Sequence, residues 1–281
     1  MAFMQIKLLN NMFKITSILF KKNNNFNKSN HYRWNNNTLN FEPIWKINVI
    51  PLFLLVGIDD QKNRILSNTT KFAKGFRMNN ALLWGVRGNG KSTLVKSIFN
   101  EVSNNYKNIR LLELNKNDLE KIIDVFELLS KNPKFRFIIF IDDLSFEKSD
   151  IEYKNIKSIL DGNISNQPNN VILYVTSNRR HLMPEDMIDN EKSSAIHTHE
   201  NIEEKISLSD RFGLWVGFHN LSQNDYLEII KKYCKYFNIE CTSEDLENSI
   251  KWSLERGNRT GRSAWQYIIE LASKKQIYIN L

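Results

Sequence analysis

The residues best suited to chemistry lie in the stretch 85–93, GVRGNGKST, which matches the pattern G-x-x-x-x-G-K-[ST]. Its glycines allow the backbone to adopt positive φ angles and to approach an anion without a Cβ in the way. Lys91 is then positioned to contact the β- and γ-phosphates of a nucleotide, and the Ser92 hydroxyl to ligate Mg²⁺. ATP and Mg²⁺ are therefore the expected cofactors. The loop residues expected to bind the phosphates are Gly85, Gly88, Asn89, Gly90, Lys91, Ser92 and Thr93.

A second candidate group is the acidic pair Asp142 and Asp143, which follows the apolar run 135–141. A continuous apolar strand that ends in carboxylates is the Walker B pattern, since a strand buried on both faces of a parallel sheet need not alternate. Asp142 is expected to hold Mg²⁺ opposite Ser92, mostly through water, and Asp143 to activate the attacking water. Most ATPases of this kind have Glu at the second position, and Asp is one methylene shorter. Slow hydrolysis and Glu147 as the base are both open alternatives.

Asn178 is the third candidate, because it lies at the end of the next apolar run, 171–176. The carboxyl ends of neighbouring parallel strands meet at one edge of a sheet, so a polar side chain there can reach the γ-phosphate or its attacking water. The alternative is an Asn that only begins a loop. Upstream of the phosphate-binding loop, the backbone near Ile58 is expected to frame the adenine, although no second signal supports this.

The elements that must position these residues alternate between apolar runs and helical patterns. The runs expected to form strands occupy residues 81–84, 109–114, 135–141, 171–176 and 214–218. Helical spacing of apolar residues follows most of them, and beyond the last run the pattern is wholly helical. We expect an α/β fold in which residues 51–220 form a parallel sheet sandwiched by helices and residues 221–281 form a small helical lid. Residues 1–50 are expected to be an extension.

The order of these motifs resembles that of the AAA+ ATPases, which combine a P-loop core with a helical lid. Within them, four stretches look like the bacterial family called domain of unknown function 815, namely residues 84–85, 142–147, 176–185 and 204–215. The resemblance covers about residues 55–271 and leaves the first 50 residues outside it. It implies an ATPase whose client is not established.

The resemblance also implies roles for individual residues. Asn178 matches the position called sensor 1, and Arg211 matches the arginine finger, which reaches the γ-phosphate of a neighbouring subunit. A finger that acts in trans implies a homo-oligomer, usually a ring. The alternative is that Arg211 only pairs with a local carboxylate. Arg262 fits the lid position called sensor 2 best, and Arg259 is the alternate.

Composition limits the remaining function classes. The net charge is +8, but residues 1–41 contain six Lys and Arg and no acid, so the other 240 residues carry 33 basic and 31 acidic side chains. A net charge of +2 on that part supports nucleic acid as a partner only weakly. Two cysteines without a CxxC motif argue against a disulfide framework or zinc site and for a reducing, cytoplasmic compartment. No apolar run is long enough to span a membrane.

Three regions are expected to lie outside the core. Residues 3–20 carry apolar side chains at helical spacing with basic residues away from them, which predicts an amphipathic helix for partner binding or targeting. Residues 23–40 are rich in Asn and predict a loop or disordered link. The polar stretch 181–206 is expected to contact a partner, with a metal site at His197 and His199 as a weaker alternative.

These expectations lead to an oligomeric ATPase that couples ATP hydrolysis to the remodelling of an unidentified macromolecular client. A P-loop kinase is disfavoured, because it needs a second substrate pocket and leaves Arg211 and the lid unexplained. The alternative is an ATP-gated nucleic-acid or protein adaptor, similar to a helicase loader, with little intrinsic hydrolysis. Trp84, directly before the phosphate-binding loop, is expected to report ATP binding through its fluorescence.

Overall fold

The computed structural model describes residues 25–146, 156–157, 160, 167–180, 182 and 211–280. The predicted helix at residues 3–20, Glu147, and the pair His197 and His199 lie outside the described residues. The stretch 181–206 also lies outside them, except for Leu182. Within the described part of the chain, no helix has the length and apolar character that crossing a membrane requires.

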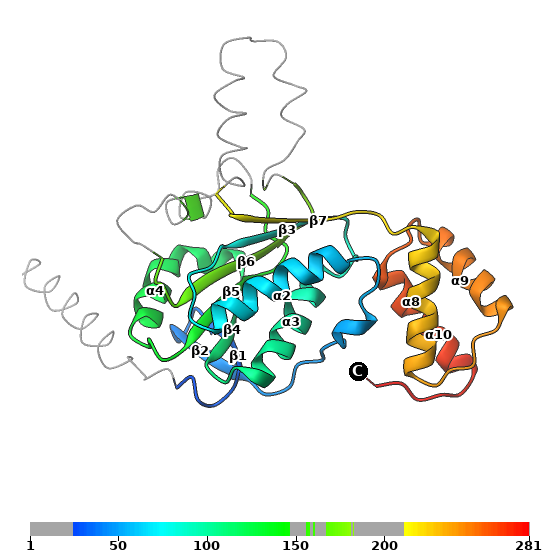
Figure 1. Ribbon diagram of the computed structural model, residues 1–281, viewed down its shortest axis with the longest axis horizontal. Coiled ribbons are helices and arrows are strands. Elements are labelled where there is room, and N and C mark those ends of the chain that lie inside the picture. Colours follow the sequence, from blue (N-terminus) through cyan, green and yellow to red (C-terminus); the bar gives the residue numbers. More distant parts are fainter. Residues whose placement is uncertain are drawn as a thin grey trace, which may run out of the picture.

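A seven-stranded sheet forms the centre of the molecule, with the strand order β2-β1-β4-β5-β6-β3-β7 (Figure 1). The strands are β1 (His31–Asn35), β2 (Asn40–Ile44), β3 (Ala81–Gly85), β4 (Ile109–Leu114), β5 (Arg136–Ile141), β6 (Val171–Ser177) and β7 (Leu214–Phe218). Every neighbouring pair is parallel except β1 and β2. The predicted parallel sheet is confirmed, and its carboxyl ends meet along one edge.

Helices cover both faces of the sheet. Strand β5 shows why, because Phe137, Ile139 and Ile141 pack on the face that α4 covers, whereas Ile138 and Phe140 pack on the face that α2 and α3 cover. Alternate residues of a strand point to opposite faces, so a strand that is apolar throughout needs both faces covered. The core helices are η1 (Leu52–Leu54), α2 (Asp59–Ala73), α3 (Lys91–Asn105), η2 (Lys116–Lys121) and α4 (Ile122–Ser130).

Three helices after β7 form the lid, as the sequence predicts: α8 (Gln223–Tyr236), α9 (Ser243–Glu255) and α10 (Gly261–Lys274) (Figure 1). Each begins at a capping box, whose first residue is Ser222, Thr242 or Thr260. Two backbone N–H groups that have no acceptor within the helix are thereby hydrogen-bonded at the start of each helix. Their apolar stripes pack into one cluster, which also buries Leu54 of η1. The lid is therefore anchored to the core next to the carboxyl edge of the sheet.

The prediction of a loop or disordered link at residues 23–40 is wrong, because β1 and β2 form a hairpin that extends the sheet beyond β4. Tyr32, Trp34 and Phe41 are buried in the core, so their apolar area stabilises the hairpin despite the surrounding Asn residues. The Asn side chains organise the turn: Asn36 accepts a hydrogen bond from the Trp34 indole at 2.7 Å. The many Asn residues here are explained by the preference of Asn for turns, where its side chain hydrogen-bonds to nearby groups.

His31 at the start of β1 makes the stability of this hairpin depend on pH. Its ring packs edge-on against Phe99 of α3, with the centroids 4.6 Å apart, and its Nε2 is buried without a hydrogen-bond partner among the described residues. Burial lowers the pKa of His31 from 6.5 to about 4; Glu113 opposes this shift, and Lys96 adds to it. The folded state thus favours neutral His31, whereas the unfolded state takes up a proton near pH 6.5.

Lowering the pH from about 7.5 to about 4.5 is therefore expected to remove up to about 3 kcal/mol of His31-dependent stability. The measurement is urea unfolding of the wild type and of His31→Phe at both pH values. His31→Phe keeps an aromatic ring against Phe99 but cannot be protonated, so it should lose less stability than the wild type over this range. Equal losses in the two proteins would show that His31 does not contribute.

Candidate functional site

The predicted phosphate-binding loop connects β3 to α3 at the carboxyl edge of the sheet. Gly85 has a φ of +120°, and a Cβ at this position would lie 2.1 Å from the carbonyl oxygen of Phe218. The next residue, Val86, donates its N–H to that same oxygen at 2.9 Å. Asn89 donates its side-chain amide to the carbonyl of His219 at 2.6 Å. The loop is thus anchored to the end of β7, and only glycine permits this close approach.

Lys91, the first residue of α3, is 7% exposed and points back into the loop. Its Nζ donates to the carbonyl oxygens of Gly85 at 2.8 Å and Val86 at 3.0 Å, and to Oδ1 of Asn178 at 3.0 Å. Burial lowers the pKa of Lys91, and the nearby cations Arg262 and Arg87 add to this, whereas Asp143 and Asp142 oppose it. The three hydrogen bonds hold the Lys91 ammonium group beside the position where the phosphates are expected to bind.

Ser92 and Asp142 meet as predicted, although they are 50 residues apart in the sequence. The Ser92 hydroxyl donates to Oδ1 of Asp142, and the Thr176 hydroxyl donates to the same oxygen at 2.5 Å. Hydroxyl and carboxylate oxygens are the hard donors that Mg²⁺ prefers, so these side chains fit that ion. Sequence reasoning missed Thr176; the signal available was a polar residue at the end of an otherwise apolar run.

Asp143 and Asn178 are also in contact. The Asn178 amide donates to Oδ1 of Asp143 at 2.5 Å, while the Asn178 carbonyl oxygen accepts from Lys91. Asp143 has a φ of +54°, a conformation uncommon for residues other than glycine, and its N–H donates to Oγ1 of Thr176 at 2.8 Å. Asn178 therefore bridges the ammonium group and the carboxylate, and the backbone at Asp143 is fixed by its neighbour strand β6.

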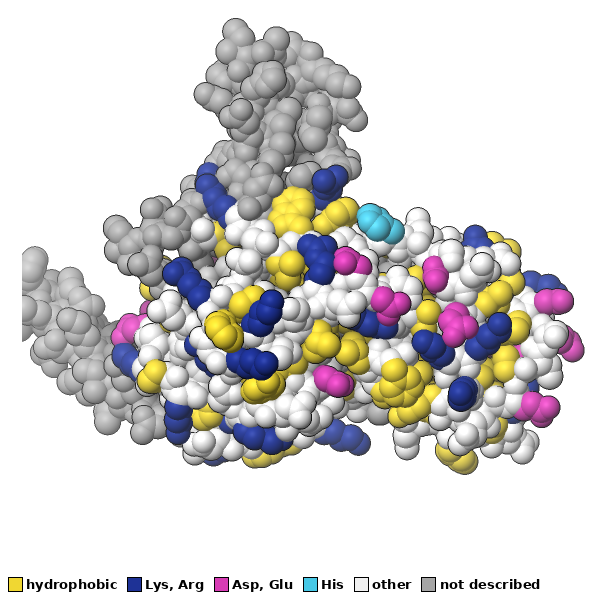
Figure 2. Space-filling model, in the orientation of Figure 1, with side chains coloured by type: hydrophobic (Ala, Val, Ile, Leu, Met, Phe, Trp, Pro, Cys, Tyr) yellow, Lys and Arg dark blue, Asp and Glu magenta, His cyan; other side chains and the backbone are white. Residues whose placement is uncertain are grey.

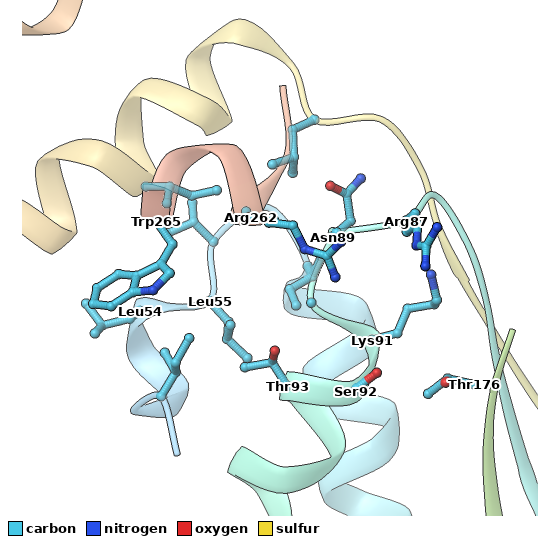
Figure 3. Close-up of a pocket in the computed structure, with 18 of the residues that line it drawn as sticks. Leu54, Leu55, Arg87, Asn89, Lys91, Ser92, Thr93, Thr176, Arg262 and Trp265 are labelled. Atoms are coloured by element: carbon cyan, nitrogen blue, oxygen red, sulfur yellow. The ribbon is translucent and has the colours of Figure 1, made fainter. Parts of the chain in front are cut away.

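The pocket above these residues has a volume of about 510 Å³ and is lined by both the core and the lid (Figure 3). Figure 3 shows the Arg262 side chain extending from the lid toward the loop side of the pocket, where Arg87 and Lys91 also lie. The Arg262 backbone N–H donates to the carbonyl of Gly88 at 3.0 Å, so the start of α10 rests on the loop. Ile58 and Thr93, the other residues expected to contact the nucleotide, also line the pocket.

Arg259, the alternate to Arg262, is not among the residues that line the pocket. Its guanidinium donates to Oε1 of Gln223 at 3.0 Å, within the lid. The pocket residues beyond the phosphate-binding loop are largely apolar and include Leu54, Tyr233 and Trp265. Sequence reasoning did not name Tyr233 and Trp265 as pocket residues, because their shared pocket depends on how the lid packs.

Trp84, whose fluorescence is expected to report ATP binding, does not line the pocket. Its ring packs edge-on against His219, with centroids 5.7 Å apart, and the Arg180 guanidinium lies 5.4 Å from its centroid. The Trp84 side chain points from β3 toward β7, where a Cβ added at Gly217 would contact its ring. Trp265 lines the pocket instead and is the better placed fluorophore.

Arg211 is the predicted site residue that the structure places far from this pocket. It precedes β7 by three residues, and β7 runs parallel to β3 with Leu214 opposite Ala81 and Phe218 opposite Gly85. Arg211 therefore lies at the amino edge of the sheet, roughly 13 Å of strand away from the loop. It lines a second hollow of about 580 Å³, together with Arg77, Asn80 and Gln167.

Solved structures that share this fold include the two that follow. The Holliday junction branch migration motor RuvB of Thermotoga maritima is 19% identical, with a TM-score of 0.52, and the alignment covers 79% of this chain and 65% of RuvB. ORC1 of Aeropyrum pernix, solved in complex with DNA, is 12% identical, with a TM-score of 0.53 and coverage of 80% and 65%. A comparison with curated proteins gives no significant match.

The family described as protein of unknown function (DUF815) matches residues 27–275. This match corrects the expectation that the first 50 residues lie outside the family resemblance, because it includes both strands of the N-terminal hairpin. The chain belongs to the DUF815 family and has the fold of the AAA+ ATPases.

Proposed function

We propose that this protein is a Mg²⁺-dependent ATP hydrolase that acts as a homo-oligomer and remodels a macromolecular client. The contact that carries the proposal is the bridge from Lys91 through Asn178 to Asp143, at the base of a pocket that Arg262 overlies. A cation for the phosphates, a carboxylate for water and an amide between them are the groups that phosphoryl transfer to water needs. Their convergence from α3, β5 and β6 is difficult to explain by packing alone.

Each residue has a separate task in this proposal. The loop amides and Lys91 bind the β- and γ-phosphates, and Arg262 adds positive charge from the lid. Ser92 and Asp142 would hold Mg²⁺, which neutralises the charge that develops on the phosphates. Asp143 accepts a proton from the attacking water, while Asn178 orients that water or the γ-phosphate. Ile58 and the apolar lid residues surround the adenine ring of the nucleotide.

Arg211 completes the site from a second subunit in this proposal. The amino edge of the sheet lies opposite the carboxyl edge that carries the pocket, so Arg211 does not reach the phosphates of its own subunit. Two copies arranged head to tail would bring one subunit's Arg211 to the other subunit's pocket, and repeated contacts of this kind close into a ring. The planar guanidinium suits the charge spread over a transferring phosphoryl group.

An ATP-gated adaptor with little hydrolysis is the alternative, and the geometry of Asp143 favours it. The carboxylate is one methylene shorter than Glu, and its Oδ1 is already occupied by Asn178. A base that is short and hydrogen-bonded activates water poorly, because a small displacement of a catalytic group costs a large factor in rate. In that case, nucleotide binding rather than turnover would control the client.

Nucleotide binding and phosphate release measured on the same protein distinguish these functions. ATP with Mg²⁺ is expected to change the fluorescence of the wild type, and this change should disappear in Trp265→Phe but persist in Trp84→Phe. Lys91→Ala should weaken ATP binding about tenfold to a hundredfold, since it removes charge-assisted hydrogen bonds to two phosphates. Lys231→Ala, which removes an exposed lysine of the lid, is the matched control.

The outcomes separate three possibilities. Binding with phosphate release that Asp142→Asn abolishes supports the hydrolase. Binding without phosphate release, also in the presence of candidate clients, supports the adaptor. No ATP-dependent change in fluorescence or calorimetric heat would contradict both functions.

A further inference from the structure

The amino edge of the sheet has an unusual charge distribution. The described segments that lead into strands β3 to β7 at this edge contain no Asp or Glu. They are residues 74–80, 106–108, 131–135, 167–170 and 211–213. In Figure 2, Lys and Arg side chains lie over both the core and the lid, whereas most Asp and Glu side chains on this face lie toward the lid. Acidic side chains are therefore scarce over the half of the core away from the lid on this face.

Six cations around the end of α2 form a surface that we call the basic edge. Its members are Lys71, Lys74, Arg77, Lys107, Lys134 and Arg136. All are exposed except Arg136, which is half-buried. None of the six forms an ion pair with a carboxylate of the described residues. Other cations of the core do, as Lys62 does with Asp59 at 2.9 Å. Within the part of the chain that the structure describes, the basic edge thus presents positive charge that no carboxylate pairs with.

Hydrogen bonds hold the three segments of the basic edge in one arrangement. Arg136 at the start of β5 donates to the carbonyl oxygens of Phe72 at 3.0 Å and Phe76 at 2.7 Å. The Arg136 backbone N–H donates to the Asn108 carbonyl at 2.9 Å, and the Asn108 side chain donates to the carbonyl of Ala73 at 3.1 Å. The cations therefore project from a pre-organised surface, which lowers the entropy cost of binding a partner.

Phe76 lies within this surface and is 62% exposed. Its backbone is held on both sides, because its N–H donates to the Lys71 carbonyl at 3.2 Å and its own carbonyl accepts from Arg136. Gly75, with a φ of +104°, allows the turn that places it there. A fixed backbone carrying an exposed aromatic ring among cations has the composition of a stacking platform for an unpaired base.

We propose that the basic edge binds single-stranded nucleic acid, with its cations on the phosphate backbone and Phe76 stacked on a base. Sequence-independent binding of this kind needs only positive charge along the strand and an exposed ring, and both are present. The near-neutral charge of the chain beyond residue 41 conceals the site, because net charge averages over surfaces that face different directions. The proposal does not depend on ATP hydrolysis.

Helix stabilisation and self-assembly are two alternative roles for the same cations. Lys71 and Lys107 lie near the carboxyl ends of α2 and α3, and Lys107 donates to the Ser103 carbonyl at 3.2 Å, so these cations also stabilise the helix dipoles. If that were their only role, their removal would lower thermal stability without affecting nucleic-acid binding. The proposed oligomer already brings Arg211, and with it Arg77 of the same hollow, close to a second copy of this chain. If the other cations of the edge also bind that copy and not nucleic acid, their removal would change ATP-dependent assembly.

The test compares two triple variants of the full chain that lose the same charge. Lys71→Ala/Lys74→Ala/Lys107→Ala removes cations of the basic edge, and Lys231→Ala/Lys235→Ala/Lys251→Ala removes exposed lysines of the lid. Fluorescence anisotropy with a labelled oligothymidine of about 20 nucleotides gives affinity over a salt series. The edge variant is expected to bind at least about tenfold more weakly, with a slope of log K against log salt smaller by about 2, and the lid variant to change less than about twofold.

Phe76→Ala separates single strands from duplexes. It should weaken binding of the oligothymidine while leaving binding of a duplex of equal length unchanged, because only unpaired bases can stack on the ring. ATP binding, followed through Trp265, should be unaffected in every variant, which shows that the pocket is intact and keeps this test separate from the proposed hydrolase. Equal affinities of the two triple variants, or a change in assembly alone, would overturn the proposal.

Discussion

Replacing Arg211 with Ala is expected to lower ATP turnover about a thousandfold while each subunit still binds ATP with its original affinity. The reason is positional, since Arg211 lies at the amino edge of the sheet and takes no part in lining its own pocket. A guanidinium that contacts the phosphates only across a subunit boundary contributes to the transition state and not to binding by the isolated subunit. Arg211→Lys should restore little activity, because an ammonium lacks the planar fork.

Mixing two inactive variants tests the subunit boundary directly. Arg211→Ala subunits retain an intact pocket, and Lys91→Ala subunits retain an intact Arg211, so a mixed oligomer contains some complete sites. Phosphate release should therefore recover partly on mixing. Arg259→Ala, which removes a guanidinium bonded only to Gln223 among the described residues, is the control and should not affect turnover. Wild-type turnover by Arg211→Ala alone, or no recovery in a mixture that co-assembles, would contradict action in trans.

Asp143→Asn is expected to reduce phosphate release about a hundredfold to ten-thousandfold, with ATP affinity maintained. The change removes the proton acceptor but keeps the size of the side chain, and the Ser92 and Asp142 contact is unaffected. The measurement is single-turnover phosphate release together with ATP binding. A variant that binds ATP without hydrolysing it also serves as a trap for the client in affinity capture.

Asp143→Glu is the informative counterpart of this variant. If the short carboxylate limits turnover, one added methylene should raise phosphate release above that of the wild type, because the carboxylate then reaches closer to the water. Substitution of Asn178 by Ala, which removes the amide now bonded to Asp143, should lower turnover, since the water or γ-phosphate loses its partner. Hydrolysis at the wild-type rate by Asp143→Asn would place the base elsewhere, with Glu147 the candidate from the sequence.

Much of the core follows from short-range patterns in the chain. The stretch from Ala81 to Asn105 contains a strand, a glycine-rich loop and a helix in immediate succession, so neighbouring residues determine its conformation. Apolar runs of strand length separated by helical patterns likewise predict the parallel sheet, because both faces of each strand must be covered. The lid helices follow from their apolar stripes and capping boxes.

The N-terminal hairpin shows where local patterns fail. Three buried aromatic residues, Tyr32, Trp34 and Phe41, stabilise it, but they are separated by Asn residues that favour turns. Their burial depends on the pairing of β1 with β4, in which His31 lies opposite Leu111. Tertiary packing therefore overrides local propensity, as it commonly does for strands.

By itself, the sequence determined the phosphate-binding loop, the acid-ended strand, the helical lid and the family resemblance, because each of these depends on residues that are close together in the chain. Only the tertiary structure decided which distant residues meet. It brought Thr176 to Asp142 and Asn178 between Lys91 and Asp143, and it placed Arg262 and Trp265, but neither Arg259 nor Trp84, in the lining of the pocket. It also put Arg211 and the basic edge on the side of the sheet opposite the pocket, since parallel strands separate residues at their two ends.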